Sequence, residues 1–249
     1  MSAKNIDQVI ARLEEIVEEA SARKDPLGIF AIVYLGVTRA VKEGIRQHVF
    51  QDGDRMERLD VAFANRYLYA HDAYRHSQAC TQAWQTTFNA AMRFDLLVLQ
   101  HLFMGMNAHI NLDLGIAAAE VVPPEELPGL EEDFNRINAL LVARIDEIQG
   151  RLCQISPLLF LVDWFGKNND ERFAEFSLVK ARNNAWKAAT RLSGLPLSDK
   201  TLEINELDNY VAILNKVIAS PGIFFGAIVR FIKWFEVKDM GVVMKLLRD

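Results

Sequence analysis

Apolar residues recur at intervals of three and four along most of this chain, a spacing typical of amphipathic α-helices. The clearest case is the segment 6–23, where the apolar residues share one helical face and four glutamates lie off that face. Only 13 glycines and 7 prolines occur in 249 residues, and they gather between the periodic segments. No segment alternates apolar and polar residues between hairpin turns. The sequence therefore predicts an all-α fold.

Three prolines directly follow a capping residue, at Asp25-Pro26, Ser156-Pro157 and Ser220-Pro221. Each pair predicts a helix start, because a capping side chain accepts from free backbone N–H groups and proline suits the first helical position. No repeat, low-complexity tract or flexible linker is present, so residues 1–249 are predicted to form a single domain. We expect a bundle of about eight to ten helices around one buried helix, residues 95–120. The other expected helices cover residues 6–23, 26–49, 55–78, a short segment around 84–88, 130–155, a segment from 157, a segment from 168–170 to 192, 198–219 and 221–237.

Charge and cysteine content narrow the class of protein. The net charge is −5 and no lysine- or arginine-rich run occurs, which argues against nucleic-acid binding. No stretch of about 18 residues is apolar throughout, and the first residues lack the apolar core of a signal peptide. The two cysteines, Cys80 and Cys153, lack the spacing of a metal or redox motif, so we expect buried, reduced thiols. These features predict a cytoplasmic protein without a transmembrane segment.

The segment 95–120 carries polar side chains on a helix whose remaining surface is apolar. A helix that is apolar all round is buried, so we expect it at the centre of the bundle. Each buried polar group without a partner costs about 1–3 kcal/mol. Asn107 and Asn111 are therefore expected to brace neighbouring backbone, and Gly105 should let a partner helix approach closely. A polar stripe on the predicted helix 55–78 consists of Asp60, Tyr67 and His71.

Histidine and aspartate on the central helix indicate a candidate metal site. His109 and Asp113 are four residues apart and are therefore neighbours on the helix surface. His101 falls within the same arc of about 120°, and Asp52 follows the second predicted helix. The four side chains make a candidate ligand set for a divalent metal such as zinc. A structural hydrogen-bonded pair is the commoner role of a buried histidine beside an aspartate, and both interpretations stay open.

Arg182 lies one turn before Trp186 in a predicted helix that is lined by alanines. Its guanidinium is expected to stack on that ring or to pair with a buried carboxylate such as Asp113 or Asp52. A structural role is the commoner one, and an anion-binding role is the alternative.

The segment 221–237 is densely apolar and contains two cations, Arg230 and Lys233. Such a helix fits contact with a membrane surface. A core helix whose two cations extend to the solvent is the commoner case.

Three segments carry a resemblance to a known family, residues 63–68, 100–117 and 181–186. They resemble a bacterial domain family of unknown function whose signature is asparagine-alanine-histidine-isoleucine-asparagine-x-aspartate-leucine, and the resemblance covers nearly the whole chain. It implies an all-helical, stand-alone domain and supplies no activity. The chain departs from the family's pattern at His48, where the pattern lacks a histidine, and at Asn184, where it has one. The positions that match the family are Asp52, Trp84, His101, His109, Asp113, Arg182 and Trp186.

Two functional hypotheses follow. The order Gly105, His109, Asp113 is similar to a helix signature of zinc-dependent phospholipase C and the related single-strand nucleases. The first hypothesis is therefore a metal-dependent hydrolase of an ester or phosphoester, with His109, Asp113 and Arg182 as catalytic residues. The second is a non-enzymatic helical protein that binds an apolar small molecule or a protein partner through a buried polar network. The metal content of the purified protein separates the two.

Overall fold

The chain is helical over most of its described length. A computed structural model describes residues 2–159 and 178–248 and contains 11 α-helices and no strand in these ranges, so the all-α prediction is confirmed. In chain order the elements are α1 (Ile6–Arg23), α2 (Gly28–Arg46), α3 (Gly53–Arg75), α4 (Gln82–Ala90), α5 (Val98–Asn107), the π-helix η1 (Ala108–Leu114), α6 (Gly115–Val121), the 3₁₀-helix η2 (Pro124–Glu126), α7 (Leu127–Ile155), α10 (Leu178–Ser193), α11 (Leu197–Ala219), α12 (Ile223–Phe235) and α13 (Met240–Arg248).

Helix ends follow local hydrogen bonding rather than the positions of the prolines. α1 begins and ends where predicted, because Asn5 caps its first turn and Lys24 adopts the left-handed conformation at its end. α2 begins at Gly28 and not at Pro26, because the Asp25 carboxylate holds a turn there.

The helix starts predicted at Pro157 and Pro221 have different outcomes. α12 begins at Ile223 and not at Pro221, because Gly222, with φ 82°, turns the chain before the helix. A turn occupies residues 157–159, and the rest of the helix predicted from there lies outside the described residues. The helix start predicted at 168–170 also lies outside them.

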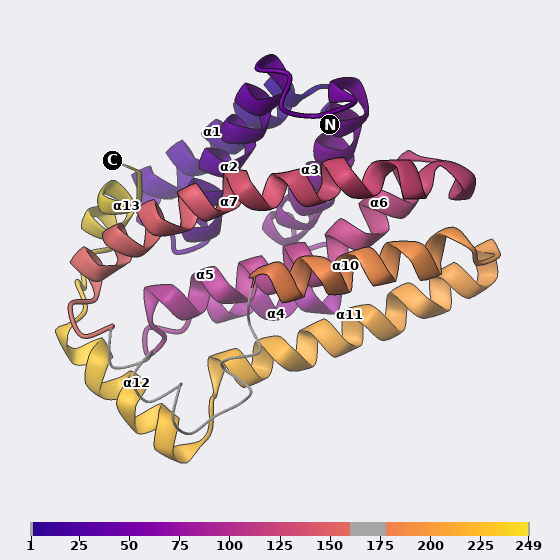
Figure 1. Cartoon of the computed structure of the whole chain (residues 1–249). Coiled ribbons are helices and arrows are strands. Elements are labelled where there is room, and N and C mark those ends of the chain that lie inside the picture. The colour runs from indigo at the N-terminus through magenta and orange to yellow at the C-terminus, as the bar shows by residue number, and fades with distance from the viewer. Residues whose placement is uncertain (1, 160–177, 249) are drawn as a thin grey trace.

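The central helix is buried as predicted, but its winding is not uniform. α5, η1 and α6 follow one another without a break, and between Ala108 and Leu114 the backbone is wound as a π-helix. α4, α10 and α11 pack against this continuous helix, as do α2 and α3 (Figure 1). Every side chain on η1 except Ile110 and Asn111 is buried. His109 and Asp113 therefore lie in the interior of the bundle.

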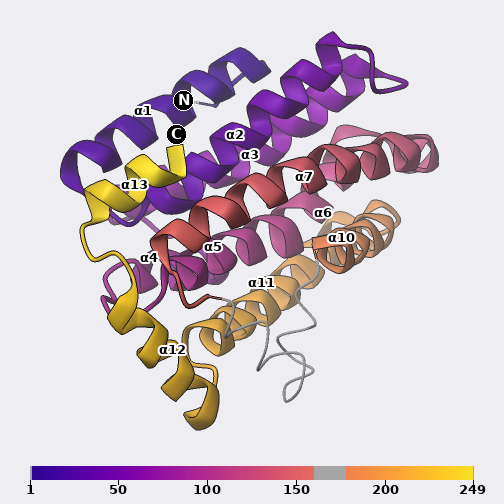
Figure 2. The same cartoon turned by 60° about the vertical axis from the view of Figure 1, so that its left-hand side comes forward.

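α7 is the longest described helix and crosses the bundle (Figure 2). It contacts α2 and α13, and it also contacts α3, α5 and α10. α13 packs against α2 and α7, so the last described helix lies beside the first helices of the chain (Figure 1). α7 therefore packs directly on α2, α3 and α5, the helices that surround the site.

Two glycines determine how closely other helices approach the central one. A Cβ atom on Gly105 would lie 2.7 Å from the ring of Phe30, and a Cβ atom on Gly115 would lie 2.7 Å from the carbonyl oxygen of Ala185. No side chain fits at either position unless its neighbour moves, because protein interiors are close-packed. The close approach predicted at Gly105 is confirmed. Because Gly115 has no side chain, α10 packs closely against α6 at that position.

Gly115→Ala is expected to lower the free energy of unfolding by about 1–3 kcal/mol, because the backbone of Ala185 has to move. Urea denaturation measures this change. Gly36→Ala is the control, since a Cβ atom there meets nothing within 4 Å. That substitution should stabilise α2 by about 0.5–1 kcal/mol. Equal effects of the two substitutions would contradict the close contact at Gly115.

α12 is buried along one side and exposed along the other. Val229 and Ile232 are buried, and Lys233 pairs with Glu236 over 2.6 Å. No helix among the described residues is long and apolar enough to cross a membrane. Membrane-surface contact through residues 221–237 stays a prediction. The exposed apolar side chains of this helix are Ile223, Phe231, Trp234 and Phe235.

Both cysteines carry free thiols, but the prediction that they are buried is wrong. Cys80 is half-buried, and Cys153 is exposed on α7. The apolar face of α7 covers only part of the helix circumference, so residues on the opposite side are exposed to solvent.

Candidate functional site

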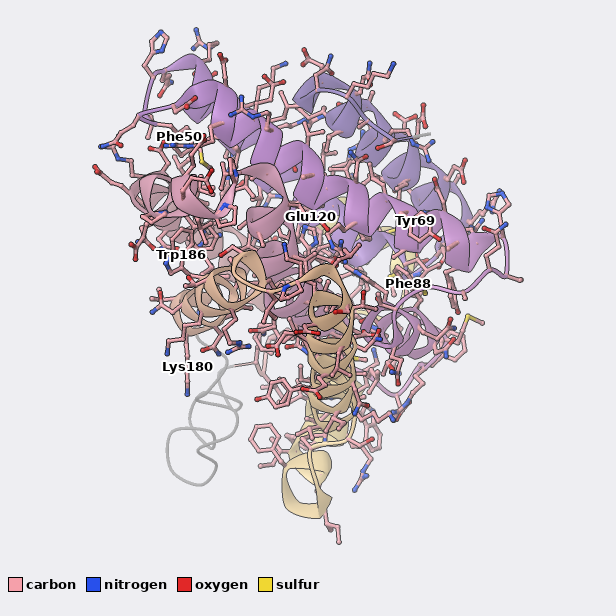
Figure 3. All side chains as sticks on the ribbon, turned by 90° about the vertical axis from the view of Figure 1, so that its right-hand side faces the viewer. Phe50, Tyr69, Phe88, Glu120, Lys180 and Trp186 are labelled. Atoms are coloured by element: carbon pink, nitrogen blue, oxygen red, sulfur yellow. The ribbon has the colours of Figure 1, made fainter. Side chains whose placement is uncertain are left out.

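Asp113, on η1, is a buried carboxylate that three side chains contact. Trp84 Nε1 donates to Oδ2 over 2.8 Å, and Arg66 Nε donates to Oδ1 over 3.1 Å. His109 Nδ1 lies 3.4 Å from Oδ2. Arg66 also approaches Glu120, which lies at the surface between α3 and α10 (Figure 3). Asp113 therefore joins α3, α4 and η1, and the positive charge of Arg66 compensates its burial.

His109 lies among aromatic rings beside Asp113. Its ring stacks on Phe63 with the centroids 3.5 Å apart and meets Tyr34 edge-on at 4.4 Å. Burial lowers the pKa of His109, although Asp113 opposes the shift, so the imidazole is neutral at neutral pH. Because a carboxylate only accepts, Nδ1 carries the proton and Nε2 is an acceptor. Nε2 is buried and has no hydrogen-bond partner in the part of the chain that the structure describes.

An apolar cavity of about 410 Å³ borders His109. Its lining comes from α2, α3, α5 and η1 on one side and from α7 on the other, and α10 contributes Leu178 and Arg182. This volume lies within the range of roughly 300–1,000 Å³ that is usual for small-molecule sites. The apolar side chains that line it include Val37, Val41, Leu102, Met106, Ile110 and Ile148.

Among the other polar side chains that line this cavity are Tyr34 from α2 and Asp60 from α3. Both are buried, and neither Tyr34 Oη nor Asp60 Oδ2 has a hydrogen-bond partner within the described ranges. Burial raises the pKa of Asp60 to about 7, and the charge of Glu57 adds to this shift. Burial also raises the pKa of Tyr34 well above its ordinary value. The cavity wall thus includes three residues, His109, Tyr34 and Asp60, that carry buried polar atoms without a hydrogen-bond partner within the described ranges.

Arg182 lines this cavity, but its contacts differ from those predicted. Its guanidinium lies 4.4 Å from the centre of the Phe134 ring, and Nη2 donates to the carbonyl oxygen of Phe134. The predicted stacking on Trp186 is replaced by this contact, because the Trp186 ring packs on Phe134 as well. The predicted pairing with Asp113 is not formed, since Arg66 occupies that carboxylate. Burial lowers the pKa of Arg182 to about 10.

His101 and Asp52 do not join His109 and Asp113. His101 is buried on α5, where burial and then the charge of Lys233 lower its pKa to about 4. Asp52 caps α3 by accepting from Arg55 N over 2.9 Å. Neither residue lines the cavity.

The structure therefore does not bring the four predicted metal ligands together, and a bound metal stays a hypothesis. No group of three or more His, Cys, Asp or Glu side chains among residues 2–159 and 178–248 is arranged to hold an ion. The oxygens of Asp113 already accept from Trp84 and Arg66. Its charge is compensated by Arg66.

The two asparagines of the central helix form the predicted brace. Asn107 Nδ2 donates to Val211 O over 3.1 Å and to Asn215 Oδ1 over 2.9 Å, both on α11. Asn111 donates to Asn107 over 2.9 Å. This network joins α11 to the central helix on the side away from His109.

Sequence reasoning missed the residues that complete the site. Arg66 and Phe63 lie in the segment 63–68, which had shown only the family resemblance. Trp84 matches the family pattern, but the resemblance assigns it no role. No sequence motif includes Tyr34. These side chains reach the site through packing between helices, which local spacing does not reveal. Asp60 was part of the predicted polar stripe, and that stripe was the signal that could have placed it near the site.

A family model described as a family of unknown function (DUF5995) matches residues 6–221. The chain belongs to this family. The part matched by DUF5995 contains every site residue described above, and it ends before α12. The two departures from the family pattern, His48 and Asn184, are exposed and do not line the cavity. No curated protein and no solved structure matches the chain, and the similarity to zinc-dependent phospholipase C is not shown.

Proposed function

We propose that this protein binds a mainly apolar small molecule in the cavity beside His109. The observation that carries the proposal is an apolar cavity of about 410 Å³ whose wall includes polar residues with buried atoms that lack hydrogen-bond partners among the described residues. Ligand sites commonly combine an apolar lining with a few polar groups that fix the orientation of the ligand.

The polar groups indicate what such a molecule carries. His109 Nε2 accepts, whereas Tyr34 Oη and protonated Asp60 donate, so a hydroxyl or carbonyl group on the ligand would satisfy them. Each of these buried atoms loses its hydration without gaining a hydrogen bond from the described part of the chain. A bound polar group removes that cost, which favours a ligand with hydrogen-bonding capacity over a pure hydrocarbon.

Met106→Trp is expected to weaken binding of the neutral dye Nile red, because the larger ring takes up part of the cavity. The measurement is the rise and blue shift of dye fluorescence on titration with the full chain. Met106 is half-buried, so the fold should tolerate the change. Met92→Trp is the control, since Met92 is 69% exposed and does not line the cavity. If both variants bind the dye as the wild type does, the cavity is not the binding site.

Hydrolysis of an ester or phosphoester is the second candidate function. It is favoured by one observation, the neutral His109 that Asp113 orients and that lines the cavity. A histidine in this state can act as a general base. The candidate requires turnover of a nitrophenyl acyl ester by the wild type and loss of turnover in His109→Ala, with Nile red binding retained. Elemental analysis of the purified protein tests whether it binds a divalent metal, as the metal-dependent hydrolase hypothesis requires.

A further inference from the structure

Arg182 is a charged side chain buried in the cavity wall with no carboxylate partner among the described residues. Only 3% of its surface is exposed. Nη2 donates to the Phe134 carbonyl oxygen, and Nε has no hydrogen-bond partner in residues 2–159 and 178–248. The Phe134 ring covers one face of the guanidinium at 4.4 Å.

These contacts with described residues supply the guanidinium with one hydrogen-bond acceptor and no counter-charge. Arginine carries five N–H donors, and a ring face with one backbone carbonyl replaces only part of the water lost on burial. A buried cation without a counter-charge is strongly unfavourable. An apolar side chain at this position would avoid the penalty, so a negative charge brought by a ligand explains why an arginine lines the cavity.

We propose that the molecule bound in this cavity is an amphipathic carboxylate, whose headgroup pairs with Arg182 and whose hydrocarbon chain fills the apolar space. This inference rests on the proposed function and adds the chemical class of the ligand. A planar carboxylate meets a guanidinium through two parallel hydrogen bonds. One negative charge balances the one buried arginine, whereas a phosphate dianion would leave a net charge in an apolar cavity.

The other arginine of the cavity wall serves as a matched control. Arg144 lies on α7, its side chain is 40% exposed, and it pairs with Glu147 over 2.6 Å. Its charge is therefore both hydrated and compensated without a ligand. Arg144→Met and Arg182→Met remove the same charge from the same cavity, but only the second is expected to affect a bound carboxylate.

Isothermal titration calorimetry with dodecanoate and with 1-dodecanol tests the inference, because the two probes share one hydrocarbon chain. The wild type should bind dodecanoate about tenfold or more tightly than the alcohol. Arg182→Met should reduce dodecanoate affinity to about that of the alcohol and leave alcohol binding unchanged. Arg144→Met should keep the wild-type ratio.

Equal affinities of the wild type for the acid and the alcohol would overturn the inference, and so would an unchanged ratio in Arg182→Met. The comparison of acid with alcohol is made on the wild type, so it decides the question even if Arg182→Met fails to fold. If the alcohol and Nile red bind but the acid has no advantage, only the carboxylate assignment fails. If none of the three probes binds, the proposed function itself fails.

Discussion

Asp113→Ala is expected to lower the free energy of unfolding by about 3–5 kcal/mol, the range for breaking a buried ion pair from one side. The carboxylate is 1% exposed, and its removal leaves Trp84 Nε1 without an acceptor. It also leaves Arg66 with only the more distant Glu120, at 3.7 Å. Urea denaturation followed by circular dichroism measures the loss.

Glu120→Gln is the matched control for Asp113→Ala. Glu120 faces the same arginine, but its side chain is 57% exposed, and exposed pairs contribute little because water screens them. The control should change the free energy of unfolding by less than about 1 kcal/mol. If Asp113→Ala proved as mild as this control, Asp113 would not be the group that joins α3, α4 and η1.

Asp60→Asn is expected to change how stability depends on pH. Burial raises the pKa of Asp60 from its ordinary 3.8 to about 7, so the folded state holds this proton more tightly than the unfolded state. The wild type should therefore lose stability as pH rises from about 4 to about 7, and the loss should level off above that range. Asparagine does not ionise, so the variant should lack this loss. At about 1.36 kcal/mol per pKa unit, the relative gain above pH 7 is on the order of 4 kcal/mol.

The measurement is the free energy of unfolding of both proteins across this pH range. Thr38→Val is the control, because Thr38 is a buried side chain on α2 that does not titrate there. Its effect should be the same at every pH. Parallel curves for Asp60→Asn and the wild type would show that Asp60 ionises in the folded state as it does in the unfolded state.

Local features of the sequence were sufficient to predict much of the fold. The limits of α1, Ile6 and Arg23, depend on side chains within one turn of each end. The burial of the central helix followed from its apolar circumference, which is also a local property. The start of α2 was misplaced because an aspartate before a proline can hold a turn as well as cap a helix.

The site was predictable only where its residues are near one another in sequence. His109 and Asp113 are four residues apart, and their contact was expected from that spacing. Arg66 and Trp84 reach Asp113 from 47 and 29 positions away. The cavity arises where side chains of α7 and α2 do not fill the space between them. Neither the contacts of Asp113 with Arg66 and Trp84 nor the cavity can be predicted from the spacing of apolar and polar residues along the sequence.

The winding of the central helix has a consequence for sequence alignments. A π segment amounts to one residue inserted into an α-helix, and here it lies between two fixed points, Gly105 against Phe30 and Gly115 against Ala185. Deleting one residue from 108–114 would allow the stretch to wind as an α-helix while both contacts are kept. It would also alter the spacing or direction of His109 and Asp113, since each residue of an α-helix turns the chain by about 100°. A one-residue gap at 108–114 in an aligned family member therefore marks a protein that keeps the fold but points at least one side chain of this pair in a different direction.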